Sequence, residues 1–460
     1  MAIVTSGEKF ATPADKRRRL LEAALRRPAA WYAGFAVYAA CVAAFSGPGL
    51  DHWWGIWAAG GYALAAVIAA ARRGRGGQVA ALAVAVAGAL VAPLTWLATQ
   101  EPSTPDATVV ARSGVLLLHH GSPYLPLAQL AHGGWLAYNP YLPVMAVFGL
   151  PKALGLPGIL GDPRPWLAAV TFLLLYATFR ITSKARAAQL RAGSGLGAAI
   201  TLAALAIASP VMAFPLAMGI TDPPVIALIC LTLAMLTRGS HGARRLWQAG
   251  LVLGVVCAMK YTAWPALAVL VVMVKARDGG RAAVRFGAVA LGTAAVLTAA
   301  LAPAALPHPD ALLRNTVAYP LGLTGVTSPA QSPLPGHLLT TLGPAGHATA
   351  IALLILAGVA LILSLVVAAP AGPARAATRI ALGLTALFAL SPATRFGYFC
   401  YPLALCGWVV LTGAGRLTVG GPASRLRLRP RPAARAAGAA GAAGPSPVPF
   451  SRRPADDGGS

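Results

Sequence analysis

Asp106 is the residue whose type and position most directly suggest chemistry. It ends the polar stretch Glu101-Pro-Ser-Thr-Pro-Asp106, which follows a long apolar run. A carboxylate there can act as a general base, taking a proton from a hydroxyl that attacks an activated carbon. The preceding Thr104-Pro105 equally favours the start of a helix, where the helix dipole stabilises an acidic side chain. The residues alone weigh these two interpretations evenly.

Two cations in polar breaks between apolar runs suit a phosphate group. Lys260 precedes Tyr261 in one such break, and Arg395 lies in a short turn of its own. Arginine holds phosphate by a bidentate fork, whereas lysine acts as a point charge. For Lys260 the alternative is a side chain that reaches up to the membrane interface.

Asp222 and Asp162 are further acidic candidates, each followed by a proline. Asp222 can bind a sugar hydroxyl or a metal, but a carboxylate before proline is also typical of a helix start, and capping is the favoured interpretation. Asp162 has the same two interpretations, with Arg164 as a neighbouring partner.

The sequence predicts no cofactor and no metal site. His119 and His120 are adjacent, so on a helix they diverge by about 100° and do not readily share one metal ion. No spacing typical of a zinc or di-iron site and no nucleotide-binding motif occurs. A divalent cation is therefore left unplaced, and any activated donor is expected to come from the membrane.

The composition is that of an integral membrane protein. The 460 residues are 57% hydrophobic, only 11% are charged, and the mean hydropathy is +0.68. A soluble domain carries about 25% charged residues. The net charge of +25 would suggest nucleic acid in a soluble protein, but here it is explained by basic cytoplasmic loops and tails, so no nucleic-acid partner is predicted.

An all-α transmembrane bundle of about twelve spans follows from the apolar runs, each near or somewhat below the ~20 residues that a bilayer needs. If both termini lie in the cytoplasm, twelve spans put the basic clusters of the short loops on the cytoplasmic side too, as the positive-inside bias requires. The predicted spans are 30–46, 53–71, 79–99, 166–182, 196–217, 223–237, 246–259, 262–274, 284–303, 348–368, 379–392 and 398–415.

This layout divides the chain into a basic cytoplasmic segment (1–29), a transmembrane domain (30–419) and a disordered basic cytoplasmic tail (420–460). It also places two large loops outside, at about 100–165 and 304–347. Residues 141–158 are apolar enough to span but would break the alternation. Their prolines favour a re-entrant or interfacial segment.

Four short motifs resemble those of the GT-C superfamily of membrane glycosyltransferases, and within it glycosyltransferase family 87, the polyprenyl-phosphate-mannose-dependent mannosyltransferase-like proteins of actinobacteria. They are Gly121-Ser122-Pro123-Tyr124, Tyr138-Asn139-Pro140-Tyr141-Leu142-Pro143, Lys260-Tyr261-Thr262-Ala263-Trp264-Pro265 and Arg395-Phe396-Gly397-Tyr398.

The resemblance implies a bacterial cell-membrane enzyme that moves a hexose, mannose in the family's pattern, from a polyprenyl-phosphate sugar to a lipid or glycan acceptor. Transfer would occur on the extracytoplasmic face with inversion, and Asp106 would be the general base. The residues expected to contact the substrates are Tyr124, Tyr138, Asn139, Asp222, Lys260, Arg395, His119 and His120.

The chain departs from the superfamily in two ways. Many of these enzymes carry an acidic pair in the first loop, whereas Glu101 and Asp106 have a different spacing, and three spans precede the loop rather than one. Asp51 in the preceding external loop therefore stays a competing base.

The alternative function is a secondary transporter or a lipid or glycolipid flippase. Broken helices with ionisable residues near the bilayer midplane are typical of transporters, and Pro210 and Pro215 favour that class. The charged residues here lie instead at helix ends and in external loops, which favours an enzyme.

Overall fold

The computed structural model describes residues 28–412 except 73, 101–103, 131, 191–195, 238–241 and 308. Three parts of the sequence-based interpretation lie outside the described residues. They are Glu101, the predicted tail (420–460) and all but the last two residues of the predicted basic N-terminal segment (1–29). Within them the secondary structure is helical, with one isolated β-bridge between Gln331 and Thr394 and no strand. The predicted all-α class is confirmed.

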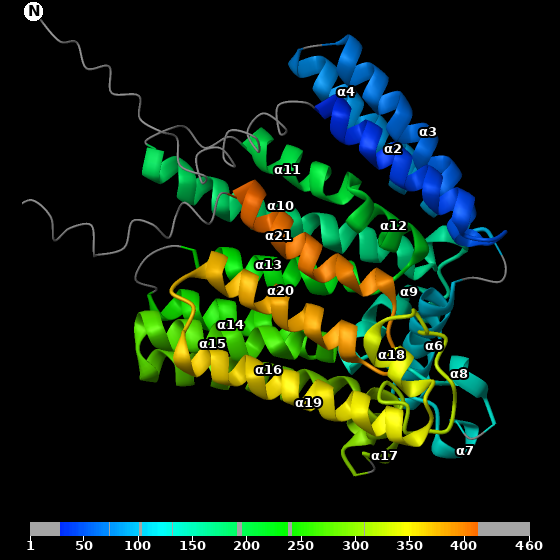
Figure 1. The fold of residues 1–460 in the computed structure, drawn as a ribbon, viewed down its shortest axis with the longest axis vertical. Coiled ribbons are helices and arrows are strands. Elements are labelled where there is room, and N and C mark those ends of the chain that lie inside the picture. The colour runs from blue at the N-terminus through cyan, green and yellow to red at the C-terminus, as the bar shows by residue number, and fades with distance from the viewer. Residues whose placement is uncertain are drawn as a thin grey trace, which may run out of the picture. The chain divides into compact units, whose positions relative to one another are not determined.

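Each of the twelve predicted spans coincides with a helix or a helix pair (Figure 1). The third is one continuous helix in which the π-helical turn η1 (Ala87–Val91) joins α4 to α5. The helices are α2 (Pro28–Phe45), α3 (Leu50–Ala71), α4 (Arg75–Val86) with α5 (Ala92–Leu97), α10 (Pro163–Leu190), α11 (Leu196–Ala208) with α12 (Pro210–Met218), α13 (Asp222–Met235), α14 (Ala243–Cys257), α15 (Trp264–Asp278), α16 (Gly280–Leu301), α19 (Pro344–Val367), α20 (Pro373–Leu390) and α21 (Cys400–Thr412).

In the described part of the chain, six of these helices are long and apolar enough to cross a membrane, and a seventh candidate is the α11–α12 pair, bent by 66°. The chain is thus a multi-pass membrane protein. Helix α13 has only 14 residues, about 21 Å at 1.5 Å per residue, against a hydrocarbon core of about 30 Å. The count of twelve crossings therefore stays a prediction.

The shorter helices are interrupted where the chain lines one cavity. The breaks between α12 and α13, α14 and α15, and α20 and α21 contribute Ile220, Lys260 and Arg395 to that cavity. Irregular backbone at membrane depth is tolerated where it is buried in protein or lines a polar space. The apolar run of each of these spans is thus cut short by the polar residues of the site.

The first large loop folds into short helices around a longer one. These are α6 (Pro105–His120), α7 (Leu127–Leu130), α8 (Gly134–Ala137), the 3₁₀-helix η2 (Pro143–Gly149), α9 (Leu150–Ala153) and the 3₁₀-helix η3 (Gly158–Leu160). Residues 141–158 contain no helix of spanning length, and their re-entrant or interfacial placement stays a prediction. A Cβ on Gly114 would lie 2.1 Å from the carbonyl carbon of Gly149, so α6 and η2 pack backbone against backbone.

The second large loop is built in the same way from short helical pieces. It contains the 3₁₀-helix η5 (Pro303–Ala305), α17 (Asp310–Leu313), the π-helix η6 (Arg314–Ala318) and α18 (Pro335–Thr340). The buried Asn315 of η6 accepts a hydrogen bond from the backbone N–H of Asn139 at 2.6 Å. The two loops therefore contact each other through buried polar groups.

Candidate active site

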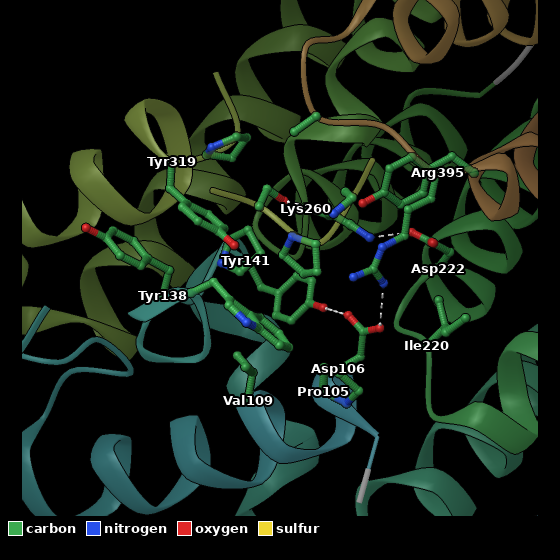
Figure 2. Close-up of a pocket in the computed structure, with 18 of the residues that line it drawn as sticks. Pro105, Asp106, Val109, Tyr138, Tyr141, Ile220, Asp222, Lys260, Tyr319 and Arg395 are labelled. Atoms are coloured by element: carbon green, nitrogen blue, oxygen red, sulfur yellow. Dashed lines mark hydrogen bonds and ion pairs between the residues drawn. The ribbon is translucent and has the colours of Figure 1, made fainter. Parts of the chain in front are cut away.

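A cavity of about 100 Å³ lies where the two loops meet the three helix breaks (Figure 2). Its wall combines two carboxylates, two cations, five tyrosines and several prolines. The residues that line it are Pro105, Asp106, Val109, Trp135, Tyr138, Pro140, Tyr141, Ile220, Asp222, Lys260, Tyr261, Tyr319, Pro320, Ser328, Pro329, Ala330, Ala393, Arg395, Gly397 and Tyr398.

Asp106 lies in the first turn of α6 and also faces the cavity, so both sequence interpretations apply to it. Its carboxylate accepts a hydrogen bond from the Tyr141 hydroxyl, and Arg395 Nη1 lies 3.5 Å from its Oδ2 (Figure 2). The side chain is 19% exposed, so part of it is accessible to solvent. Asp106 is a half-buried carboxylate held by one donor and one cation.

Tyr141 is held in place by two residues that sequence analysis assigned to substrate binding. The Tyr124 hydroxyl donates to the Tyr141 carbonyl at 2.8 Å, and the Asn139 side-chain oxygen accepts from the Tyr141 N–H at 3.1 Å. Tyr124 and Asn139 are buried and do not line the cavity. Burial, and next the charge of Asp106, raise the pKa of Tyr141 and keep its hydroxyl protonated as a donor.

Lys260 forms a buried ion pair with Asp222, which also lines the cavity (Figure 2). The Tyr401 hydroxyl also donates to Asp222, at 2.8 Å. The Lys260 Nζ lies 5.3 Å from the ring centroid of Tyr141 and 5.6 Å from that of Tyr398, which are cation–π distances. Burial acts to lower the pKa of Lys260, but the charge and hydrogen bond of Asp222, together with the charge of Asp106, raise that pKa overall, so Lys260 stays a cation.

Arg395 is positioned by the second loop. Ser332 N–H donates to the Thr394 carbonyl at 3.0 Å, and Thr394 N–H donates to the Ala330 carbonyl at 2.9 Å, which holds the turn before α21 against the loop. The Arg395 side chain is 34% exposed. Burial acts to lower the pKa of Arg395, yet Asp106 and neighbouring tyrosines raise it overall. A permanent cation thus faces the cavity with part of its guanidinium accessible.

The wall on the loop side is aromatic. The rings of Tyr138 and Tyr319 stack with centroids 4.5 Å apart and an interplanar angle of 11°. Both line the cavity, one from each loop. Such a pair gives a rigid apolar surface next to the charged groups.

Of the residues predicted from the sequence, the structure brings Asp106, Tyr138, Asp222, Lys260 and Arg395 into one cavity. His119 and His120 are exposed on the last turn of α6 and do not line it. Asp51, the competing base, is exposed in the first turn of α3 and does not line it either.

Four tyrosines of the wall were not among the predicted site residues. Tyr141 stands two positions after Asn139, and Tyr261 and Tyr398 closely follow the two cations, so the motifs themselves contained that signal. Tyr319 had no local signal. Among the described residues there is no group of three His, Cys, Asp or Glu side chains that could hold a metal ion, and a divalent cation stays unplaced.

Chemically, the arrangement offers a carboxylate that can accept a proton beside a cation that can hold an anion, in one small polar cavity. An oxygen nucleophile and an anionic leaving group could both be served there.

The chain is similar to a known protein family and to a solved structure. A family model of glycosyltransferase family 87 matches residues 139–393, more than half of the chain. The crystal structure of ArnT from Cupriavidus metallidurans bound to undecaprenyl phosphate is 16% identical, with a TM-score of 0.45 over 75% of this chain. The match covers 63% of that structure's chain. No curated protein matches.

The matched family segment begins at Asn139 and includes Asp222 and Lys260, whereas Asp106 precedes it and Arg395 follows its last residue by two positions. The roles of Asp106 and Arg395 therefore rest on the geometry of the cavity. With more than half of its length matched, this membrane chain belongs to glycosyltransferase family 87.

Proposed function

We propose that this cavity transfers a hexose, with mannose as the first candidate, from a polyprenyl-phosphate sugar to a hydroxyl of a lipid or glycan acceptor. The reaction would take place on the extracytoplasmic side of a bacterial cell membrane and would invert the anomeric configuration. The observation that carries the proposal is the pairing of Asp106 with Arg395 in one cavity, because a base and a phosphate-binding cation are the two groups that such a transfer requires.

In the proposed step, Asp106 takes the proton of the acceptor hydroxyl while the acceptor oxygen forms a bond to the anomeric carbon. The bond between that carbon and the phosphate oxygen breaks, and its electron pair leaves on the phosphate. Arg395 stabilises the charge that develops there. Because the acceptor attacks the face opposite the leaving phosphate, a single displacement inverts the anomeric centre. The proton ends on Asp106 and the polyprenyl phosphate is released.

A lipid-linked donor is supported by the place of the site and by the sequence. The cations lie at breaks between apolar helices, where a phosphate attached to a membrane lipid can reach them. The sequence has no nucleotide-binding motif that would serve a sugar nucleotide.

Arg395 is assigned the larger share of phosphate binding. Its guanidinium is partly exposed and lies 3.5 Å from Asp106, whereas the Lys260 ammonium is buried in its ion pair with Asp222. Lys260 is proposed as a second, weaker phosphate contact, because its ammonium is the less accessible of the two.

The test is a transfer assay on purified protein with radiolabelled polyprenyl-phosphate hexoses and a membrane lipid extract as acceptor. The expected result is a labelled glycolipid or glycan from polyprenyl-phosphate mannose, with the anomeric configuration opposite to that of the donor. Transfer with retained configuration would contradict the single displacement. Absence of transfer from every polyprenyl-phosphate hexose, with transfer from a sugar nucleotide, would contradict the donor class.

A further inference from the structure

Arg164 is one of the largest fully buried side chains among the described residues, and it lies behind the cavity rather than in its wall. It stands at the start of α10. Its Nη1 donates to the Leu97 carbonyl at 3.1 Å and to Asp162 Oδ2 at 3.0 Å, and its Nη2 donates to Thr104 Oγ1 at 3.1 Å. One guanidinium thus joins the end of α5 to the residue before α6.

Thr104 extends this connection to a third element. Its hydroxyl accepts from Arg164 and donates to the carbonyl of Met218, the last residue of α12, at 2.6 Å. The side chain is 3% exposed. Since Asp106 lies two positions after Thr104, the hydroxyl fixes the start of the helix that carries the proposed base.

The turn after Met218 packs against Arg164 and against the first turn of α6. Gly219 has φ +74, and a Cβ there would lie 2.9 Å from Arg164 Cγ and 3.1 Å from the Cβ of Ala107, the neighbour of Asp106. Only glycine adopts that backbone conformation at little cost and leaves the space that Arg164 fills. Asp222 follows three positions later, so this turn also sets the second carboxylate of the cavity.

We infer that Arg164 and Thr104 form a positioning clamp that sets Asp106 and Asp222 relative to each other without contacting substrate. The clamp joins α5, α6, α10 and α12 through buried hydrogen bonds, of which the two from Arg164 are charge-assisted, and such bonds tolerate little displacement. The inference rests on the proposed role of Asp106 as the base.

The first test uses Thr104→Val, which removes the hydroxyl at nearly constant volume, and Thr104→Ser, which keeps it. A displacement of about 1 Å at a catalytic group can cost 10²-fold in rate, so we expect Thr104→Val to lower kcat at least about 10-fold, with KM for the donor changed less than about 2-fold. Thr104→Ser should restore kcat. Thr349→Val is the matched control, because the exposed Thr349 on α19 donates its hydroxyl to Ala345 of the same helix, and neither residue belongs to the clamp or the cavity.

A second variant covers the case in which Thr104→Val does not fold. Arg164→Lys keeps a positive charge beside Asp162 but has a single ammonium, which does not reproduce the guanidinium fork to Leu97 and Thr104. The same loss of kcat per folded protein is expected. Thermal unfolding and size-exclusion chromatography report the folded fraction for every variant.

The last measurement repeats Thr104→Val in the Asp106→Asn background. If the clamp acts through Asp106, Thr104→Val lowers the residual kcat less there than in the wild type. The same fold-loss in both backgrounds would overturn the clamp, as would a Thr104→Val protein that is less stable but turns over normally.

A fully active Asp106→Asn protein would overturn the proposed base and this inference together. An inactive Asp106→Asn protein with a normal Thr104→Val protein would overturn the clamp alone.

Discussion

Arg395 Nη1 lies 3.5 Å from Asp106 Oδ2, which pairs a cation and a carboxylate that stand 289 positions apart in the chain. The two groups proposed for the acceptor proton and the donor phosphate are therefore neighbours in the free protein. An acceptor oxygen and a phosphate held by these groups would lie within one small space, as a single displacement requires.

Asp106→Asn tests the base most directly. Asparagine keeps the size of the side chain and its compatibility with a helix start but cannot take a proton. We expect a folded protein with turnover lowered by about 10²-fold or more. The matched variant is Asp51→Asn, in which an exposed carboxylate outside the cavity is changed. Normal turnover in Asp106→Asn with loss in Asp51→Asn would move the base to Asp51.

Tyr141→Phe removes the hydroxyl that donates to Asp106 and leaves the ring next to Lys260. A hydrogen bond to a charged group contributes about 1.5–3 kcal/mol, so kcat is expected to fall by about 10-fold or more while the protein stays folded. Steady-state kinetics with a saturating donor measures this loss. Tyr38→Phe, on helix α2, is the comparison. Equal kinetics in both variants would show that the Tyr141 hydroxyl does not support the base.

Arg395→Lys is expected to weaken donor binding, because a partly exposed bidentate fork becomes a point charge. Loss of one charge-assisted hydrogen bond predicts a donor KM raised about 10-fold. Arg314→Lys, in the second large loop but outside the cavity, serves as the control. Donor concentration series for Arg395→Lys, Lys260→Gln and the control provide the comparison. Unchanged donor dependence in both cavity variants would remove phosphate binding from these cations.

The ion pair between Lys260 and Asp222 predicts a compensating double variant. Lys260→Gln leaves the buried Asp222 carboxylate without its cation, which is expected to lower the free energy of unfolding by about 3–5 kcal/mol. Adding Asp222→Asn removes the unpaired charge and should recover much of that loss. Thermal unfolding of the single and double variants in one detergent measures the effect. A double variant less stable than Lys260→Gln would argue against charge compensation.

The proposed extracytoplasmic site predicts a labelling pattern in intact cells. A cysteine at the exposed position Thr327, in the second large loop, should react with a membrane-impermeant maleimide from outside. A cysteine at Gly74, between α3 and α4, should react only after permeabilisation. The reverse pattern would place the cavity on the cytoplasmic side.

Much of the fold could be predicted from the sequence because its signals are local. Uncharged runs such as 53–71 and 348–368 are apolar over the length of a span, and both form long helices. Placing an ionisable side chain among membrane-spanning helices costs free energy, so such residues usually have a function. The breaks around Asp222, Lys260 and Arg395 therefore indicated candidate site positions. All three line the cavity.

The tertiary structure alone decided which of these groups meet and which do not. Nothing near Lys260 in the sequence indicated that Asp222 would pair with it. His119 and His120 end the helix whose first turn carries Asp106, yet they lie away from the cavity. Arg164 was noted only beside Asp162, although its guanidinium also bonds to the end of α5 and to the residue before α6. Residue patterns encode local burial and helix formation, whereas contacts across 38 to 289 positions depend on how the finished helices and loops pack.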